Sequence, residues 1–539
     1  MVSTAASLPP DSSRSTTSLV RSTMLVAGVR GLDFLLSFLV SVLLANRFGA
    51  TGQLDAFFLA RRTTVGFADT IRKLVGQAVM PAVIARIDRG EHLSIHGLPP
   101  RIYWFVGGLA ALTLAGTLIP SLLVTAFAPG FTGERHDLTA TMMAIMMPLL
   151  PTAVVASLLV AVLQANRRYL LSEGTNIVQR GLLVLVLAVA VPPLGIVAGA
   201  WTMLFSGLVG TAILLIGAWS IIRKRPAALL GAQDEAASQP AAVGGGVAAA
   251  IVLNLYFQAT SLFDFAVAST VPEGGVAALE YGARLVSLIP GLVMSSLSIV
   301  LQPELVRAMQ DPDPGRAAAG LARFQRLGFF AQLPVSIGMM LGAELIVRTL
   351  FGHGAFGESS ILLAAGTTAG YAAAQIFLAP MSATTSAIYA DPRASCLRDI
   401  AVIAVGGIVL RGLMLAIAAP LWGAAGIAWA AAASTLGTLM LAQWIATRRF
   451  REFDMTAQLI DFARSALCAG FAAAAGYALM WFGPHADGVV QWLAMLGLLG
   501  TVVLGVYAAA ALALRVPEMA SARAVFVPAL MRKLGRKTR

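Results

Sequence analysis

Charged residues are scarce in this chain of 539 residues, and cysteine is nearly absent. Only 12% of the residues are charged and 58% are hydrophobic, whereas a soluble domain is about 25% charged and about 45–50% apolar. The two cysteines, Cys396 and Cys468, stand far apart, so we expect neither a disulfide framework nor a cysteine-based metal site. The composition excludes an ordinary soluble domain and predicts a polytopic membrane protein.

Motifs for several kinds of chemistry are also missing. The sequence has no GxxxxGK[ST] loop for ATP phosphates, no HExxH zinc site and no CxxC pair. No residues suggest a nucleophile with its base. We therefore expect neither an enzyme nor a resident metal or cofactor, while coupling to Na⁺ or H⁺ stays open.

Long apolar runs fill most of the chain and predict about fourteen transmembrane helices. One span needs about 20 apolar residues, and lipid admits only helices or closed barrels. No alternating strand pattern is present, so the expected fold class is all-α. The predicted spans are 23–45, 54–80, 102–128, 138–163, 175–193, 196–221, 245–270, 276–302, 324–350, 360–386, 398–418, 422–446, 460–482 and 490–514.

Basic residues give the orientation. The net charge is +12, and Lys and Arg accumulate in cytoplasmic loops. Every second loop is basic, as are both termini, which predicts an even number of spans with both ends in the cytoplasm. We interpret the basic run at 532–539 as a tail near anionic headgroups rather than as a nucleic-acid site.

The chain repeats itself at an offset of about 225–228 residues. FAPGFTGE at 127–134 resembles FGHGAFGE at 351–358, AVLQANRRYL at 161–170 resembles SAIYADPRAS at 386–395, and PLGIVAGAW ending at Trp201 resembles PLWGAAGIAW ending at Trp429. Six helices return the chain to its starting side, so the repeat is parallel, with a pseudo-twofold axis along the membrane normal. Two six-helix lobes are expected, with the substrate path between them and two further C-terminal helices.

These patterns give the expected domain limits. They are an N-terminal cytoplasmic tail at 1–22, an N-lobe at 23–222, a cytoplasmic linker at 223–244, a C-lobe at 245–446, helices 13 and 14 at 447–516, and a basic cytoplasmic tail at 517–539.

The predicted second helix carries the most informative charges. Reading from Leu54 to Arg86, it is about 50 Å long at 1.5 Å per residue, longer than a hydrocarbon core of about 30 Å. We expect Pro81 to end this helix and Pro303 to end helix 8. Along helix 2 stand the candidate cavity residues Asp55, Arg61, Arg62, Arg72 and Lys73.

Charges at membrane depth mark pathways and binding sites, and arginine forks suit phosphate oxygens. The cations therefore indicate a site for a pyrophosphate or another anionic head. The alternatives are that Arg72 and Lys73 only mark the cytoplasmic end, and that Arg61 pairs with Asp55.

Other charged residues lie inside predicted spans. Arg30 of helix 1 is a further cavity candidate, or it pairs with Asp33. Arg284 of helix 8 is another cavity candidate. Asp264 and Asp399 are candidate carboxylates for coupling to a cation or proton, and the alternative is that each pairs with a nearby arginine.

Several short motifs together carry a family resemblance. They are FGA at 48–50, DAFF at 55–58, YGARL at 281–285 with Pro290, Pro303, FGHGAF at 351–356 and YAD at 389–391. In this order, over roughly residues 25–450, the chain resembles the MurJ/MviN family of lipid II flippases, within the multidrug/oligosaccharidyl-lipid/polysaccharide exporter superfamily. The resemblance implies fourteen helices, of which helices 1–12 form two lobes and helices 13 and 14 are additional, and a monomer in the bacterial inner membrane. It also implies a central cavity that alternates between cytoplasm and periplasm and moves an undecaprenyl-pyrophosphate-linked saccharide.

The chain departs from the family pattern near the expected head-group site. Phe34 and Val40 stand where the family has helix 1 arginines, and the segment 71–81 lacks the family's acidic residue. Arg62 and Arg284 stand at basic family positions. The substrate is therefore lipid II or a related exopolysaccharide or O-antigen unit. Functions of other classes are a cation-coupled multidrug antiporter, which would favour an acidic cavity, and a non-transporting membrane scaffold.

Overall fold

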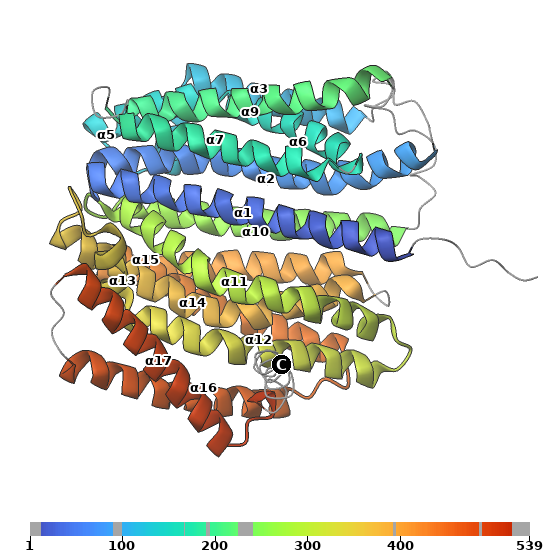
Figure 1. Cartoon of the computed structure of the whole chain (residues 1–539), viewed down its shortest axis with the longest axis vertical. Helices are drawn as coiled ribbons and strands as arrows, with labels where there is room; N and C mark the ends of the chain where they lie inside the picture. The colour runs from blue at the N-terminus through green and yellow to red at the C-terminus, as the bar shows by residue number, and fades with distance from the viewer. Residues whose placement is uncertain are drawn as a thin grey trace, which may run out of the picture. The chain divides into compact units, whose positions relative to one another are not determined.

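The structure, a computed structural model, describes residues 12–89, 100–166, 168–189, 195–224, 241–391, 395–483 and 488–519. Within these ranges every regular element is a helix (Figure 1). The helices are α1 Ser12–Phe48, α2 Gly52–Arg89, α3 Pro100–Leu118, α4 Pro120–Phe127, α5 Gly133–Met146, α6 Leu149–Ala165, α7 Tyr169–Val189, α9 Val197–Lys224, α10 Ala241–Ala268, α11 Gly275–Gln310, α12 Pro314–Leu341, α13 Ala343–Phe351, α14 Glu358–Ala390, α15 Cys396–Arg449, α16 Met455–Phe482 and α17 Val489–Ala513. The all-α prediction is confirmed for the described residues.

Each predicted span overlaps a helix or a bent pair of helices. The pair α3 and α4 bends by 98°, and the pair α12 and α13 by 67°. The predicted spans 398–418 and 422–446 form one element, α15, which is broken at Gly423, where φ is 56°. Glycine suits this left-handed conformation because it has no Cβ.

The count of fourteen spans is not confirmed. By length and apolarity, 9 helices of the described chain can cross a membrane, or up to 11 if each bent pair is one span. Helices α2 and α11 are not among them; α2 carries charges along its length. These are the helices that hold Arg61, Arg62 and Arg284.

The expectation that prolines end two of these helices is wrong. Helix α2 runs past Pro81 to Arg89, and α11 runs past Pro303 to Gln310. Proline removes one hydrogen bond and crowds the preceding turn, which these long helices accommodate. With its 38 residues, α2 extends about 57 Å at 1.5 Å per residue, so it is even longer than expected.

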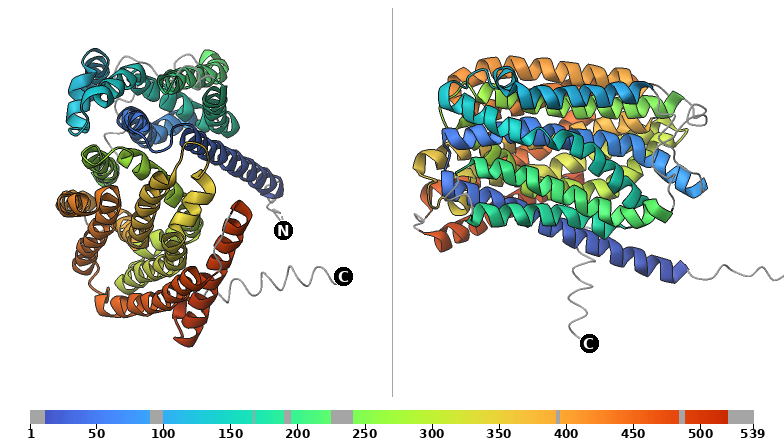
Figure 2. Two further views of the ribbon diagram at one scale, coloured as in Figure 1. Left: turned by 90° about the vertical axis from the view of Figure 1, so that its left-hand side faces the viewer. Right: turned by 90° about the horizontal axis from the view of Figure 1, so that it is seen from above.

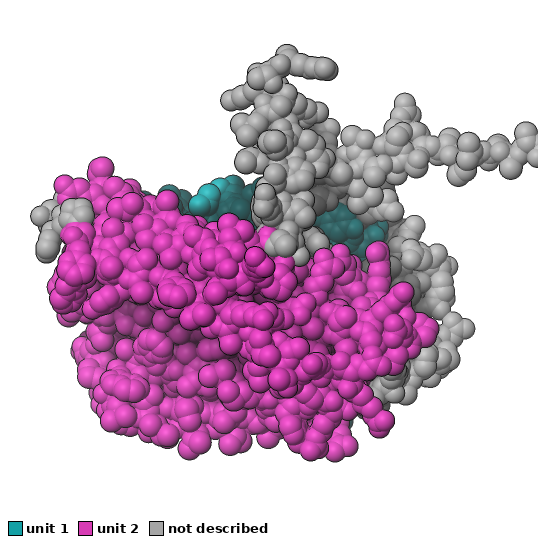
Figure 3. Space-filling view, turned by 90° about the horizontal axis from the view of Figure 1, so that it is seen from below, with its two compact units in different colours: residues 1–43, 67–118, 143–238 teal, residues 44–66, 119–142, 239–539 magenta. Residues whose placement is uncertain are grey.

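The chain divides into two compact units, coloured in Figure 3. Unit 1 comprises residues 1–43, 67–118 and 143–238, and unit 2 comprises 44–66, 119–142 and 239–539. The segments 44–66 and 119–142 of the expected N-lobe thus group with the second half of the chain. The expected domain limits stay a prediction; α1 already begins at Ser12, and most of the linker and of the C-terminal tail lies outside the described residues.

Within unit 1, α9 packs against α6 and α7, and α3 packs against α6. Within unit 2, α14 packs against α11, α12 and α15, and α10 packs against α15. The extra helices α16 and α17 lie side by side next to α12 (Figure 2). Tyr507 of α17 donates a hydrogen bond to the Phe330 carbonyl of α12 at 3.0 Å.

Small residues bring the central helices of unit 2 close together. A Cβ atom on Gly370 of α14 would lie 2.7 Å from the carbonyl carbon of Ala428 in α15. A Cβ atom on Gly282 of α11 would lie 2.9 Å from the backbone nitrogen of Thr368 in α14. Membrane helices associate through such close contacts because lipid supplies no hydrophobic drive between them. This packing fixes α11, whose charges belong to the candidate site.

Candidate functional site

Asp55 joins the start of α2 to the start of α11. Its buried carboxylate accepts hydrogen bonds from the backbone N–H groups of Gly274 and Ala277, each at 2.7 Å. These N–H groups lie at a helix N-terminus, which has no backbone partners of its own and favours negative charge. The expectation that Asp55 pairs with an arginine, Arg61 in particular, is wrong, because the carboxylate binds the backbone of α11.

Further backbone contacts around Asp55 join the two halves of the sequence. The N–H of Ala355 donates to the Asn46 carbonyl at 2.9 Å, and the N–H of Gly130 donates to the Ser269 hydroxyl at 3.0 Å. Ala355 follows Gly130 by 225 residues, the repeat offset. The end of α1 therefore meets a loop of the second repeat, and the end of α10 meets the matching loop of the first. Such reciprocal contacts fit two repeats related by a twofold axis, and the direction of that axis stays a prediction.

Arg61 pairs with a glutamate of α11 that lies one helical turn before Arg284. Arg61 Nη1 is 3.2 Å from Oε1 of Glu280 on α11. Arg284 follows Glu280 by one helical turn, so the two side chains share a helix face, and Arg284 is partly buried. Arg61 of α2 thus contacts α11 one helical turn from Arg284, a second predicted site cation.

Arg62 turns from α2 toward α10. Its guanidinium donates to the Ser261 hydroxyl and lies over the Phe265 ring, 5.2 Å from the ring centre. One turn further along α2, a Cβ on Gly66 would lie 3.3 Å from the Gln258 amide nitrogen. Arg62 is ten residues into α2, about 15 Å along the helix axis. Its guanidinium thus contacts a polar and an aromatic side chain of α10.

The structure does not add Arg72 and Lys73 to this group. Arg72 Nη1 is 3.5 Å from Oδ1 of Asp69 on the same helix, and both side chains are largely exposed, 41% and 53%. Lys73 is exposed. These positions agree with the alternative that the two residues mark the end of the span.

Two ion pairs join α1 to α7 within unit 1. Arg30 Nη2 lies 2.9 Å from Oε1 of Glu173. Asp33 Oδ1 accepts from Arg180 Nε at 2.6 Å. The alternative that Arg30 pairs with Asp33 is therefore wrong, because each finds its partner on α7. The sequence analysis missed Arg180, although an arginine inside the predicted span 175–193 was a usable signal.

Asp264 lies in the interior of unit 2 with a guanidinium against it. Arg411 Nε donates to its Oδ1 at 2.8 Å, and Arg411 Nη1 donates to the Ser434 hydroxyl at 2.9 Å. Tyr371 Oη lies 3.2 Å from Asp264 Oδ2. The structure thus agrees with the alternative that this coupling candidate pairs with an arginine. Arg411 was missed as well, despite its place inside the predicted span 398–418.

Asp399, the second coupling candidate, is also paired. Arg449 Nη1 donates to Asp399 Oδ2 at 2.6 Å, and Arg449 Nε donates to Asp391 Oδ2 at 2.8 Å. Asp399 stands in the first turn of α15 and Arg449 in its last turn. The cluster therefore joins the two ends of α15, which is broken at Gly423. It is separate from Asp264.

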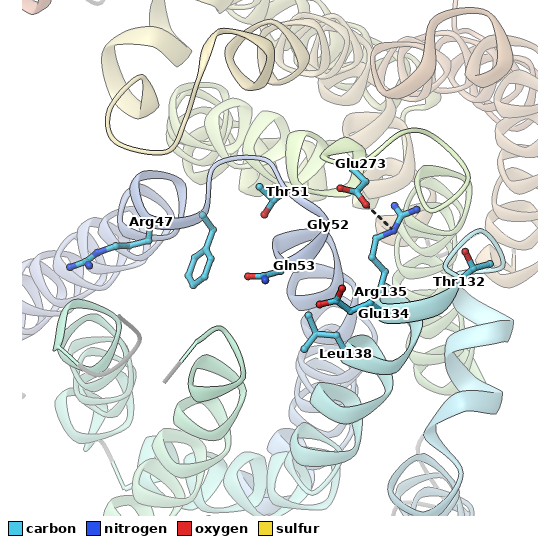
Figure 4. A pocket seen from close by; sticks show the side chains of 10 residues that line it. Arg47, Thr51, Gly52, Gln53, Thr132, Glu134, Arg135, Leu138 and Glu273 are labelled. Atoms are coloured by element: carbon cyan, nitrogen blue, oxygen red, sulfur yellow. Dashed lines mark ion pairs between the residues drawn. The ribbon is translucent and has the colours of Figure 1, made fainter. Parts of the chain in front are cut away.

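A polar cavity of about 580 Å³ opens beside the first turn of α2 (Figure 4). Arg135 points toward Glu273 there, with Nε 3.6 Å from Oε1. The lining residues are Arg47, Phe48, Thr51, Gly52, Gln53, Thr132, Glu134, Arg135, Leu138 and Glu273. Among the described residues, no group of three or more His, Cys, Asp or Glu side chains is placed to hold a metal ion.

Comparison with known proteins gives one consistent result. The profile of a family described as "Lipid II flippase MurJ" matches residues 44–498. A "Probable lipid II flippase MurJ" of Rhizobium meliloti is 27% identical over 370 residues, which cover 64% of this chain and 66% of that protein. A "Lipid II flippase MurJ" of Burkholderia cenocepacia is 23% identical over 422 residues, 76% of this chain and 80% of that protein. The first match thus spans about two thirds of its relative.

Solved structures show the same fold. A "Lipid II flippase MurJ, inward closed conformation" matches with a TM-score of 0.68 at 16% identity, covering 90% of this chain and 98% of that one. An inward-facing multidrug resistance transporter of the MATE family and the MOP superfamily matches with a TM-score of 0.62 at 12% identity, covering 79% and 96%. At these identities the likeness concerns the fold alone.

Proposed function

This chain belongs to the lipid II flippase MurJ family, and on that premise we propose that it moves an undecaprenyl-pyrophosphate-linked saccharide precursor across the inner membrane. The direction is from the cytoplasmic to the periplasmic leaflet, by alternating access and without covalent chemistry on the substrate. Its family and its many apolar helices make it a multi-pass membrane protein. The further proposal is that it acts as a monomer with both termini in the cytoplasm.

The arginines of α2 and α11 carry the proposal. Arg61, Arg62 and Arg284 lie inside helices at membrane depth, where one arginine costs about 2.5–3.5 kcal/mol on insertion scales. Glu280 offsets the charge of Arg61, while Ser261 and Phe265 receive Arg62 without a carboxylate. The candidate site on α2 and α11 therefore offers three guanidinium groups. Guanidinium groups bind phosphate oxygens through paired hydrogen bonds, so a pyrophosphate head is the matching ligand.

The contacts of Asp55 provide a means of closing one end of the path. The Asp55 carboxylate, in the first turn of α2, accepts hydrogen bonds from backbone N–H groups at the start of α11. The two halves of the sequence therefore contact each other there. We propose that this contact forms when the path is closed at the α2 start, which the charge pattern assigns to the periplasm. Opening would then require both hydrogen bonds to break.

The sequence leaves three alternatives to lipid II transport open. A lipid-linked exopolysaccharide or O-antigen unit would use the same pyrophosphate contacts with a different sugar. A cation-coupled multidrug antiporter would favour an acidic cavity, and it is disfavoured because the candidate site residues Arg61, Arg62 and Arg284 are basic. A non-transporting scaffold would not need arginines at membrane depth.

Binding of lipid II to the purified protein tests the proposal. We expect native mass spectrometry to detect lipid II on the parent protein. Arg62→Gln and Arg284→Gln should each weaken binding about tenfold or more, since a hydrogen bond to a charged group contributes about 1.5–3 kcal/mol. Arg316→Gln is the control, because Arg316 is 71% exposed and pairs with Asp311 in a loop. Lipid II binding that is unchanged in both Arg62→Gln and Arg284→Gln would contradict the proposal.

The same assay distinguishes the sugars. Undecaprenyl pyrophosphate that carries an O-antigen-type saccharide is offered in competition with lipid II. Preference for lipid II supports the substrate that the family name implies, and preference for the other saccharide supports the alternative.

A further inference from the structure

Arg180 and Asp33 form the shorter of the two described ion pairs between α1 and α7. Arg180 Nε donates to Asp33 Oδ1 at 2.6 Å, and Arg180 Nη1 donates to the Ser37 hydroxyl at 2.8 Å. Asp33 and Ser37 are one turn apart on α1, so they present two oxygens on the same face. All three residues belong to unit 1.

The pair lies at membrane depth but is not sealed from its surroundings. Arg180 is eleven residues into α7, a helix of 21 residues that passes as a membrane span. Its side chain is 36% exposed, and that of Asp33 is 24% exposed. A guanidinium exposed to hydrocarbon at mid-span is costly, so this exposed edge faces water or a polar ligand.

Comparison with Arg411 shows what is unusual here. Arg411 is also mid-span, but its side chain is 9% exposed and its Nε, Nη1 and Nη2 all donate hydrogen bonds within unit 2. Arg180 donates through Nε and Nη1 to described residues, and its side chain is four times as exposed as that of Arg411. The guanidinium of Arg411 is fully used in contacts that hold the helices of unit 2 together. The partly exposed guanidinium of Arg180 is available to a ligand.

We infer that Arg180, held by Asp33 and Ser37, is an anion-binding residue that takes a phosphate oxygen in place of the Asp33 carboxylate. In the free protein Asp33 neutralises the guanidinium and keeps it oriented. A phosphate anion offers two or more acceptors to the same fork, so it exchanges with the carboxylate. The inference rests on the proposed function, since it assigns the pyrophosphate of the lipid-linked substrate as the source of that phosphate.

A phospholipid headgroup carries the same phosphate chemistry, so the experiment uses two probes. Undecaprenyl pyrophosphate and phosphatidylglycerol are each titrated onto detergent-purified full-length protein, and binding is measured by native mass spectrometry. If undecaprenyl pyrophosphate binds through Arg180, the source is the substrate. If only phosphatidylglycerol does so, the assigned source is wrong and the site belongs to a membrane lipid.

The decisive variants change the two partners in opposite ways. Arg180→Gln should weaken undecaprenyl pyrophosphate binding about tenfold, the loss of one charge-assisted contact. Arg180→Lys should restore part of it. Asp33→Asn should tighten binding several-fold, because it removes the competing carboxylate. An ion pair that only joins two helices predicts no gain of binding in Asp33→Asn, and that result would overturn the inference.

Two further variants complete the test. Arg316→Gln removes an exposed arginine that lies outside unit 1, so it is the control for the loss of one positive charge and should leave binding unchanged. Arg62→Gln, measured in parallel, separates the two proposals. If Arg62→Gln weakens binding and Arg180→Gln does not, this inference fails and the proposed function stands. If the parent binds no undecaprenyl pyrophosphate at all, the proposed function fails.

Discussion

Asp264 of α10 and Arg411 of α15 form a buried ion pair between residues 147 positions apart in the sequence. Their side chains are 4% and 9% exposed. Ser434 accepts a hydrogen bond from the same guanidinium, and Tyr371 lies within hydrogen-bonding distance of the carboxylate. The group connects α10, α14 and α15, so it fixes the interior of unit 2 and gives a carboxylate in the membrane its counter-ion.

Breaking this pair is expected to destabilise the protein strongly. Arg411→Gln leaves Asp264 as an unpaired buried charge, and such single changes cost about 3–5 kcal/mol. The double variant Asp264→Asn with Arg411→Gln should lose less than the two single variants together, because neither group is then left charged alone. Thermal unfolding in detergent measures all three.

Arg316→Gln is the control for that series, because exposed ion pairs contribute about 0–1 kcal/mol and Arg316 is 71% exposed. Additive losses in the double variant would show that Asp264 and Arg411 do not act as a pair.

The contact of Asp55 with α11 predicts a second measurable effect. Asp55→Ala removes the acceptor for two backbone N–H groups, and losing such a cap costs about 0.5–2 kcal/mol. The first turn of α11 should then open more often. A cysteine at Ala277, which is fully buried, should react faster with a water-soluble maleimide in Asp55→Ala than in the parent.

Asp69→Ala serves as the matched control, since Asp69 is an exposed carboxylate on the same helix. Both native cysteines are buried and are replaced by serine beforehand. Equal labelling rates in the Asp55 variant and the parent would contradict the assigned role of this contact.

The packing of α14 against α15 gives a third prediction. A Cβ on Gly370 would lie 2.7 Å from Ala428 backbone, so Gly370→Ala should force the helices apart and cost about 1–3 kcal/mol. Gly412 of α15 has no heavy atom within 4 Å of its Cβ position. Gly412→Ala should therefore leave stability unchanged or raise it by about 0.5–1 kcal/mol. Thermal unfolding compares them, and equal effects would refute the packing argument.

The fold could be read largely from the sequence because apolar length determines a membrane helix almost locally. The helices and the bend near Gly423 each left a pattern within a few tens of residues, and the repeat left matching motifs about 225–228 residues apart. The ends of α2 and α11 could not be predicted from their prolines. Pro81 and Pro303 lie inside long helices, because the surrounding helix continues despite the loss of one hydrogen bond.

The site was harder to predict, since an ion pair depends on which helices become neighbours. Arg30, Asp33 and Asp55 each had a plausible partner close in sequence, yet all three contact residues more than 100 positions away. Arg180 and Arg411 carried a signal in their position, as arginines inside predicted spans. That signal identifies a constrained residue but does not name its partner.

Coupling to an ion gives the last prediction. The chain lacks an ATP-binding loop, so another free energy must bias the two states of the path. A cation or proton can do this only if its affinity differs between the states. At Asp264 the cation would have to displace Arg411, and at Asp399 it would compete with an Arg449 that also holds Asp391. Asp264 is therefore the stronger candidate, because its release would free the contact between α10 and α15.

We expect Asp264→Asn, reconstituted in liposomes, to transport lipid-linked substrate without the response to an imposed Na⁺ or H⁺ gradient that the parent shows. Asp399→Asn should keep that response, because Asp391 still pairs with Arg449. If Asp264→Asn responds to both gradients as the parent does, Asp264 is not the coupling group. The bias would then come from the membrane potential acting on the arginines or the substrate, since moving one charge through 100 mV supplies about 2.3 kcal/mol, or from supply and consumption of substrate on the two sides.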